Sequence, residues 1–128
     1  MPLPESELTH LRDRGGVFDV STESNMTCVL LRDYALPKGY DRGMSDLLLR
    51  LSPGFPDVQP DMWWFDPPVR RTDGGPIPQT NSTEHYLGRS WQRWSRHLQA
   101  GQWRPGIDTL QSFLAVIRAD LEKYAVVG

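Results

Sequence analysis

Two histidines and a serine in the second half of the chain are the side chains best suited to chemistry. Ser95 lies two residues before His97, and His85 lies ten residues before Ser95. A serine hydroxyl attacks a carbonyl only when a base takes its proton, and an imidazole with a pKa of about 6.5 can be that base. Arg93 and Arg96 could stabilise the resulting oxyanion. From the residues alone, an ordinary loop hydroxyl beside structural tryptophans is the favoured interpretation of Ser95, and a nucleophile is the alternative.

Cys28, the only cysteine, is the competing nucleophile, because a thiolate needs less activation than a hydroxyl. It lies between Thr27 and Val29 in an apolar stretch, which favours a buried small hydrophobic residue. One cysteine excludes an intrachain disulfide and a multi-cysteine zinc site. The three scattered histidines have no further ligands at suitable spacing, so we expect no metal and no cofactor.

Length and composition predict one domain over residues 1–128. A hydrophobic share of 38% and a charged share of 23% exclude both a membrane protein and a disordered chain. The 11 glycines and 11 prolines argue against a long helical bundle. The first residues lack the features of a secretory signal, so we expect a cytoplasmic protein without membrane contact.

Hydrophobic periodicity predicts an α+β fold with a helix at each end. The first helix covers residues 5–13, and the last covers residues 107–124, with Ile107 opening its apolar stripe. Between them we expect an antiparallel meander of four strands, at residues 17–20, 26–31, 46–51 and 62–65. We predict a long irregular loop over residues 69–105. Loops of this length are uncommon in compact domains unless they are functional. Both helices are expected to pack on the sheet.

The stretch from Leu49 to Phe65 resembles the ubiquitin-conjugating enzyme family, with Phe55-Pro56 and Pro60 in place of its Tyr-Pro pair and later proline. Downstream, Trp103-Arg104-Pro105 resembles the Trp-Ser-Pro segment that opens a helix in that family. The run from Gly88 to His97 is similar to a bacterial branch whose genes lie beside those for ubiquitin-like and activating-enzyme-like proteins. The resemblance implies a ubiquitin-conjugating-enzyme/RWD-like fold with the active site in the long loop.

The chain departs from this family at the acyl-carrying cysteine, which the family places eight residues before its tryptophan. Eight residues before Trp103 this chain has Ser95. His85 matches the family's histidine, but Tyr86 and Leu87 replace the proline and asparagine that follow it.

The resemblance also suggests partner-binding residues. His10 lies on the first helix, which in the family meets the activating enzyme; a solvated helix face is the alternative. Phe55 and Tyr40 could form a protein-binding patch, although the role of a packed turn residue is favoured for Phe55, and Trp64 could face the long loop or a partner. Trp94 and its arginine neighbours could contact a conjugation partner, stack on nucleic acid, or pin the long loop to the sheet. We rank loop pinning first and nucleic acid third, because the net charge of the chain is −2.

Two functional hypotheses follow from the resemblance. In the first, the chain is a conjugating acyl transferase that carries a ubiquitin-like protein on Ser95 as an oxyester. In the second, it is a non-catalytic adaptor for a ubiquitin-like protein or for an activating-enzyme-like protein.

Overall fold

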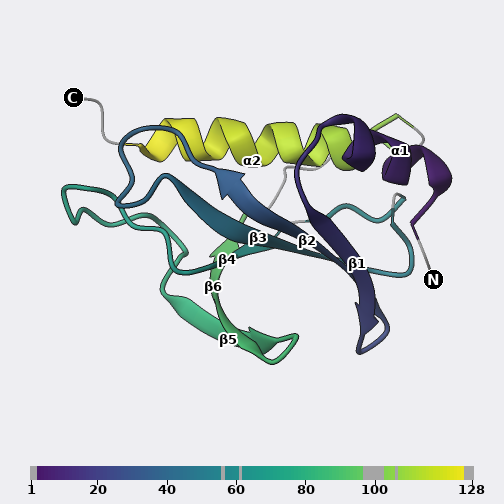
Figure 1. Ribbon diagram of the computed structural model, residues 1–128, viewed down its shortest axis with the longest axis horizontal. Helices are drawn as coiled ribbons and strands as arrows, with labels where there is room; N and C mark the ends of the chain where they lie inside the picture. The colour runs from purple at the N-terminus through teal and green to yellow at the C-terminus, as the bar shows by residue number, and fades with distance from the viewer. Residues whose placement is uncertain (1–2, 56, 61, 97–102, 106, 126–128) are drawn as a thin grey trace.

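The computed structural model describes residues 3–55, 57–60, 62–96, 103–105 and 107–125. It has an α+β architecture in which one long helix crosses a face of a six-stranded antiparallel sheet (Figure 1). The strand order is β1-β2-β3-β4-β6-β5. The elements are α1 (Glu5–Asp13), β1 (Phe18–Glu23), β2 (Met26–Ala35), β3 (Met44–Leu51), β4 (Met62–Asp66), β5 (Ser82–Tyr86), β6 (Arg89–Ser95) and α2 (Leu110–Tyr124).

Both predicted helices are present, but the second begins later than the periodicity indicated. Thr109 precedes the first turn of α2, and its amide donates a hydrogen bond to the hydroxyl of Ser112 at 3.2 Å. This capping contact fixes the start of the helix at Leu110. Ile107, which we expected on the apolar stripe, lies before the helix and is 62% exposed.

The expected count of four strands is wrong, because the segment predicted as a long irregular loop contains the β5–β6 hairpin. Leu87 and Gly88 connect the two strands with φ angles of 55° and 73°. Two positive φ values are typical of the tight turns that match the twist of paired strands. β6 also pairs with β4, so the hairpin extends the sheet beyond the predicted meander.

The main core lies between α2 and the face of the sheet that it covers. Trp63 and Trp94 pair across β4 and β6, and their rings stack with centroids 6.2 Å apart. Phe113 of α2 meets Trp63 edge to face at 5.8 Å. The stripe of α2 that faces the sheet consists of Leu110, Phe113, Leu114, Ile117 and Leu121, all of them buried.

The opposite face of the sheet, here called the concave face, carries a second and smaller apolar cluster. Its buried members are Cys28, Leu30, Leu48, Trp64 and Trp91. The sheet bends so that the β5–β6 hairpin curves away from α2 (Figure 1). At the end of β1, the carboxylate of Glu23 accepts a hydrogen bond from the Leu87 amide at 3.0 Å. The turn of the β5–β6 hairpin is therefore tied back to the end of the β1–β2 hairpin.

No helix in the part of the chain that the structure describes is long and apolar enough to cross a membrane.

Candidate functional site

Ser95 is the last residue of β6 and pairs with Met62 of β4. Its amide donates a hydrogen bond to the carbonyl of Gln79 at 3.1 Å, and the residue is only 9% exposed. The serine therefore ends a strand instead of lying in an open loop. His97, its expected base, lies outside the described residues.

His85 does not approach Ser95. It lies on β5 directly opposite Ser90, whose hydroxyl oxygen is 3.3 Å from each of the two ring nitrogens. Ser90 and Ser95 are five residues apart on β6, which corresponds to roughly 16 Å of extended strand. The hairpin thus separates two residues that the sequence places in one short segment.

Arg93 takes part in a polar network on the concave face. Its Nη1 atom donates to Glu84 at 2.9 Å, and its Nη2 atom donates to the hydroxyl of Ser82 at 3.3 Å. Glu84 also accepts hydrogen bonds from the Trp64 indole and from the Tyr86 hydroxyl, both at 2.9 Å. Burial raises the pKa of Glu84, but these donors outweigh it and leave the pKa below its ordinary value. The network therefore holds an ionised carboxylate.

Arg96, directly after Ser95, anchors the end of β6 to α2. Its Nε atom donates to Asp120 at 2.9 Å, and Nη1 donates to the carbonyls of Pro78 and Ser95, both at 2.8 Å. Burial raises the pKa of Asp120, and the nearby guanidinium partly opposes that shift. The guanidinium also lies over three rings, those of Trp63, Trp94 and Tyr124.

A cavity of about 340 Å³ adjoins this anchor, with Ser95, Arg96 and Tyr124 among its lining residues. The Nη2 atom of Arg96 is buried and has no hydrogen-bond partner among the described residues. Ser95 and Arg96 therefore border the same space.

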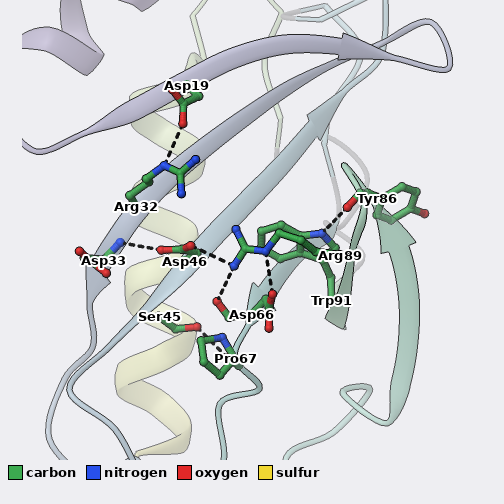
Figure 2. Close-up of polar contacts among 10 residues, drawn as sticks. All are labelled: Asp19, Arg32, Asp33, Ser45, Asp46, Asp66, Pro67, Tyr86, Arg89 and Trp91. Carbon is green, nitrogen blue, oxygen red and sulfur yellow. Dashed lines mark hydrogen bonds and ion pairs between the residues drawn. The ribbon is translucent and has the colours of Figure 1, made fainter.

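Arg89 is held at the other end of β6 by two carboxylates. It donates to Asp46 of β3 at 3.0 Å and to Asp66 of β4 at 2.8 Å. Figure 2 shows the guanidinium between these carboxylates and over the ring of Trp91, with its carbon 4.4 Å from the ring centroid. The contact joins three strands of the sheet.

Each arginine between His85 and Ile107 is engaged with an acidic side chain. Arg89 pairs with Asp46 and Asp66, Arg93 with Glu84, Arg96 with Asp120 and Arg104 with Asp108. Trp91 and Trp94 are fully buried, on opposite faces of the sheet. These contacts favour the structural interpretation of this segment over nucleic-acid binding.

The expected partner-binding residues differ in their access to solvent. Trp94 is fully buried, and Trp64 is only 5% exposed. Phe55 is half-buried and packs on Trp103, with ring centroids 6.2 Å apart. His10 is partly exposed on α1. Phe55 and His10 are therefore the two that reach the surface.

The concave-face network includes residues that the sequence analysis did not single out. The guanidinium of Arg50 lies over the ring of Tyr86, with its carbon 3.8 Å from the ring centroid. Alternation along β3 was the available signal, since it places Arg50 opposite the leucine face. Among the described residues, no group of three or more potential metal ligands exists.

Residues 3–124 match the model of a family described as prokaryotic E2 family E. Searches of curated proteins and of solved structures returned no significant match.

Proposed function

Because this chain belongs to prokaryotic E2 family E, a bacterial family similar to ubiquitin-conjugating enzymes, we propose that it acts as an adaptor in ubiquitin-like conjugation. The family itself implies a role in ubiquitin-like conjugation. In the adaptor role, the chain binds a ubiquitin-like protein or an activating-enzyme-like protein and forms no covalent bond to either.

The single observation that carries this proposal is the burial of the candidate nucleophiles. Cys28 is fully buried inside the sheet, and Ser95 is 9% exposed. His85 is engaged with Ser90 on the far part of the hairpin. An acyl acceptor must reach a carbonyl carbon on another protein, and the burial of both side chains disfavours that approach.

Partner docking would use the surface around α1 and the loop after β3. His10 supplies a partly exposed imidazole on α1, and Phe55 supplies a half-buried ring packed on Trp103. Aromatic rings that are half-buried before binding lose little conformational freedom when they become fully buried.

The test is a binding measurement with a purified ubiquitin-like protein and a purified activating-enzyme-like protein from the same organism. We expect a complex whose affinity is unchanged in Ser95→Ala and reduced at least about tenfold in Phe55→Ala. Val17→Ala is the matched apolar control, since Val17 is 66% exposed and lies before β1. Absence of a complex with both proteins would overturn the adaptor role.

A second candidate function is the carrier role on Ser95, and the cavity beside Arg96 favours it. In this reaction the Ser95 oxygen bonds to the C-terminal carbonyl carbon of a ubiquitin-like protein. The bond from that carbon to the activating enzyme's carrier group breaks, and His97 takes the hydroxyl proton. Arg96, which lines the cavity, would stabilise the oxyanion.

The carrier role predicts a covalent adduct when the chain is mixed with ATP and the two partner proteins. The adduct would be labile to hydroxide, resistant to thiols and lost in Ser95→Ala. Ser90→Ala is the matched control, since Ser90 lies on the same strand but faces His85. A wild-type chain that forms a stable complex but no adduct would exclude the carrier role and support the adaptor role.

A further inference from the structure

The tip of the β5–β6 hairpin, residues 84–91, extends beyond the part of the sheet that holds the hairpin in place. β6 pairs with β4 over Gln92 to Ser95. From Glu84 to Leu87 and on to Trp91, the described strand pairing joins the tip strands to each other and to no third strand. A two-stranded ribbon is at best marginally stable by itself in water. The position of the tip therefore depends on side-chain contacts.

The tip covers the apolar cluster of the concave face. Tyr86 and Leu87, both partly buried, pack against this cluster. The ring of Tyr86 meets the ring of Trp64 nearly edge to face, with centroids 5.5 Å apart. Trp64 is only 5% exposed, although it lies on the face of the sheet opposite to α2 (Figure 1). On this face the hairpin tip, and not a helix, shields the cluster from water.

Two contacts hold the turn of the hairpin down. The carboxylate of Glu23 accepts a hydrogen bond from the Leu87 amide at 3.0 Å, and the guanidinium carbon of Arg50 lies 3.8 Å from the centroid of the Tyr86 ring. Leu87 has a φ angle of 55°, which is unfavourable for a residue with a bulky side chain. The contact with Glu23 thus stabilises a turn that the local sequence does not favour.

Two further contacts hold the sides of the tip. Glu84 accepts a hydrogen bond from the Trp64 indole at 2.9 Å, and Arg89 is paired with Asp46 and Asp66 (Figure 2). The side chains that the tip contributes are 29% exposed at Glu84 and 31% exposed at Arg89. Water can replace such contacts when they open, because partly exposed ion pairs add little net stability.

The base of the hairpin is fixed much more firmly than its tip. The side-chain oxygen of Gln92 accepts a hydrogen bond from the Val69 amide at 2.8 Å, and its nitrogen donates to the Val69 carbonyl at 3.1 Å. Trp94 is fully buried beneath α2. The change from a fixed base to a weakly held tip occurs at the pair formed by Thr83 and Gln92.

We propose that residues 84–91 form a flap that opens about a hinge at Thr83 and Gln92 and uncovers the apolar cluster of the concave face. In the open state the Leu87 amide leaves Glu23, and the Trp64 indole leaves Glu84. The main core keeps its packing, because it lies on the other face of the sheet. The device goes beyond the proposed function, since it does not depend on the adaptor or the carrier role.

The test is hydrogen exchange of the tryptophan indole protons in the full chain, followed by ¹H–¹⁵N correlation spectra in deuterated water. The Trp64 indole donates to Glu84 of the flap, whereas the Trp94 indole donates to Gln92 at 3.0 Å on the other face. Flap opening exposes only the first of these protons. We therefore expect the Trp64 indole to exchange at least about tenfold faster than the Trp94 indole. Equal rates would mean that both protons exchange through complete unfolding, and the flap would be refuted.

Glu23→Ala removes the acceptor that holds the turn. It should speed exchange of the Trp64 indole by about tenfold, the effect expected for one lost hydrogen bond to a charged group, and leave the Trp94 indole unchanged. Asp19→Ala is the matched control, because Asp19 lies on the same strand and its 53% exposed side chain pairs with Arg32. Both indoles should keep their wild-type rates in this control.

Two results in Glu23→Ala would contradict the flap. One is an unchanged rate for the Trp64 indole, and the other is an equal acceleration of the Trp94 indole, which would indicate a general loss of stability. If Glu23→Ala does not fold, the wild-type chain still decides by the urea dependence of exchange. Opening of the flap alone exposes little surface, so the Trp64 rate should change little at low urea. A rise as steep as that of global unfolding would overturn the proposal.

Discussion

The imidazole of His85 faces Ser90 across the β5–β6 hairpin, with the serine oxygen 3.3 Å from each ring nitrogen. Both residues are exposed and lie away from Ser95. We therefore predict that His85→Gln changes the free energy of unfolding by no more than about 0.5 kcal/mol, and that in the carrier role it leaves adduct formation on Ser95 unchanged. Gel assays of conjugation and urea denaturation measure the two quantities. A loss of adduct in His85→Gln, with folding intact, would place this histidine in the reaction.

Arg89 is predicted to stabilise the concave face. Arg89→Gln leaves Asp46 and Asp66 without their cation, and their side chains are only 16% and 28% exposed. We expect a loss of about 2 kcal/mol in the free energy of unfolding, measured by urea denaturation. Arg32→Gln is the matched control: its pair with Asp19 is about half exposed, so its loss should stay below about 1 kcal/mol. Equal losses in the two variants would contradict the prediction.

The raised pKa of Tyr40 predicts how the free energy of unfolding changes at alkaline pH. Its hydroxyl donates to the Leu121 carbonyl, and burial, aided by Asp120, raises its pKa from 10.0 to about 12. Between these values the unfolded chain loses the phenol proton while the folded chain keeps it, so stability falls as pH rises. In Tyr40→Phe, the free energy of unfolding should decrease over this pH range by on the order of 2 kcal/mol less than in the wild-type chain.

The measurement for Tyr40 is urea denaturation at a series of alkaline pH values. Some pH dependence will remain in Tyr40→Phe, because burial also raises the pKa values of Tyr34 and Tyr86. The same pH slope in the wild-type chain and in Tyr40→Phe would refute the assignment.

Glu7 is predicted to stabilise the start of α2. It is only 5% exposed, and its carboxylate accepts a hydrogen bond from the Leu110 amide at 2.9 Å. A carboxylate at a helix N-terminus satisfies a free amide and complements the helix dipole. Glu7→Ala should cost about 2 kcal/mol in the free energy of unfolding. Glu5→Ala, at a position with a 77% exposed side chain, should cost less than about 0.5 kcal/mol.

Local periodicity was sufficient to predict the helices and the first four strands. The first helix has the bounds expected from its leucine spacing, β2 to β4 contain the predicted stretches, and β1 begins one residue later than predicted. The leucines of β3 alternate with Arg50 in the order that a strand requires. Such patterns depend on neighbours in sequence, so a single chain reveals them.

The β5–β6 hairpin was missed because its signals are weak locally. Its turn is Leu87-Gly88 and not an asparagine–glycine pair, and its strands have five and seven residues. Trp91 and Trp94 are three residues apart, so the strand sends them to opposite faces and into separate clusters. Pairing with β4 is what stabilises this segment as a strand.

The sequence alone placed Ser95, His85 and three arginines in one segment and related the chain to ubiquitin-conjugating enzymes. Only the tertiary structure decided that His85 faces Ser90, and that Arg89 and Arg96 pair with Asp46 and Asp120 from distant elements. The physical reason is that strand register and helix packing bring together residues whose separation along the chain carries no information about their contact.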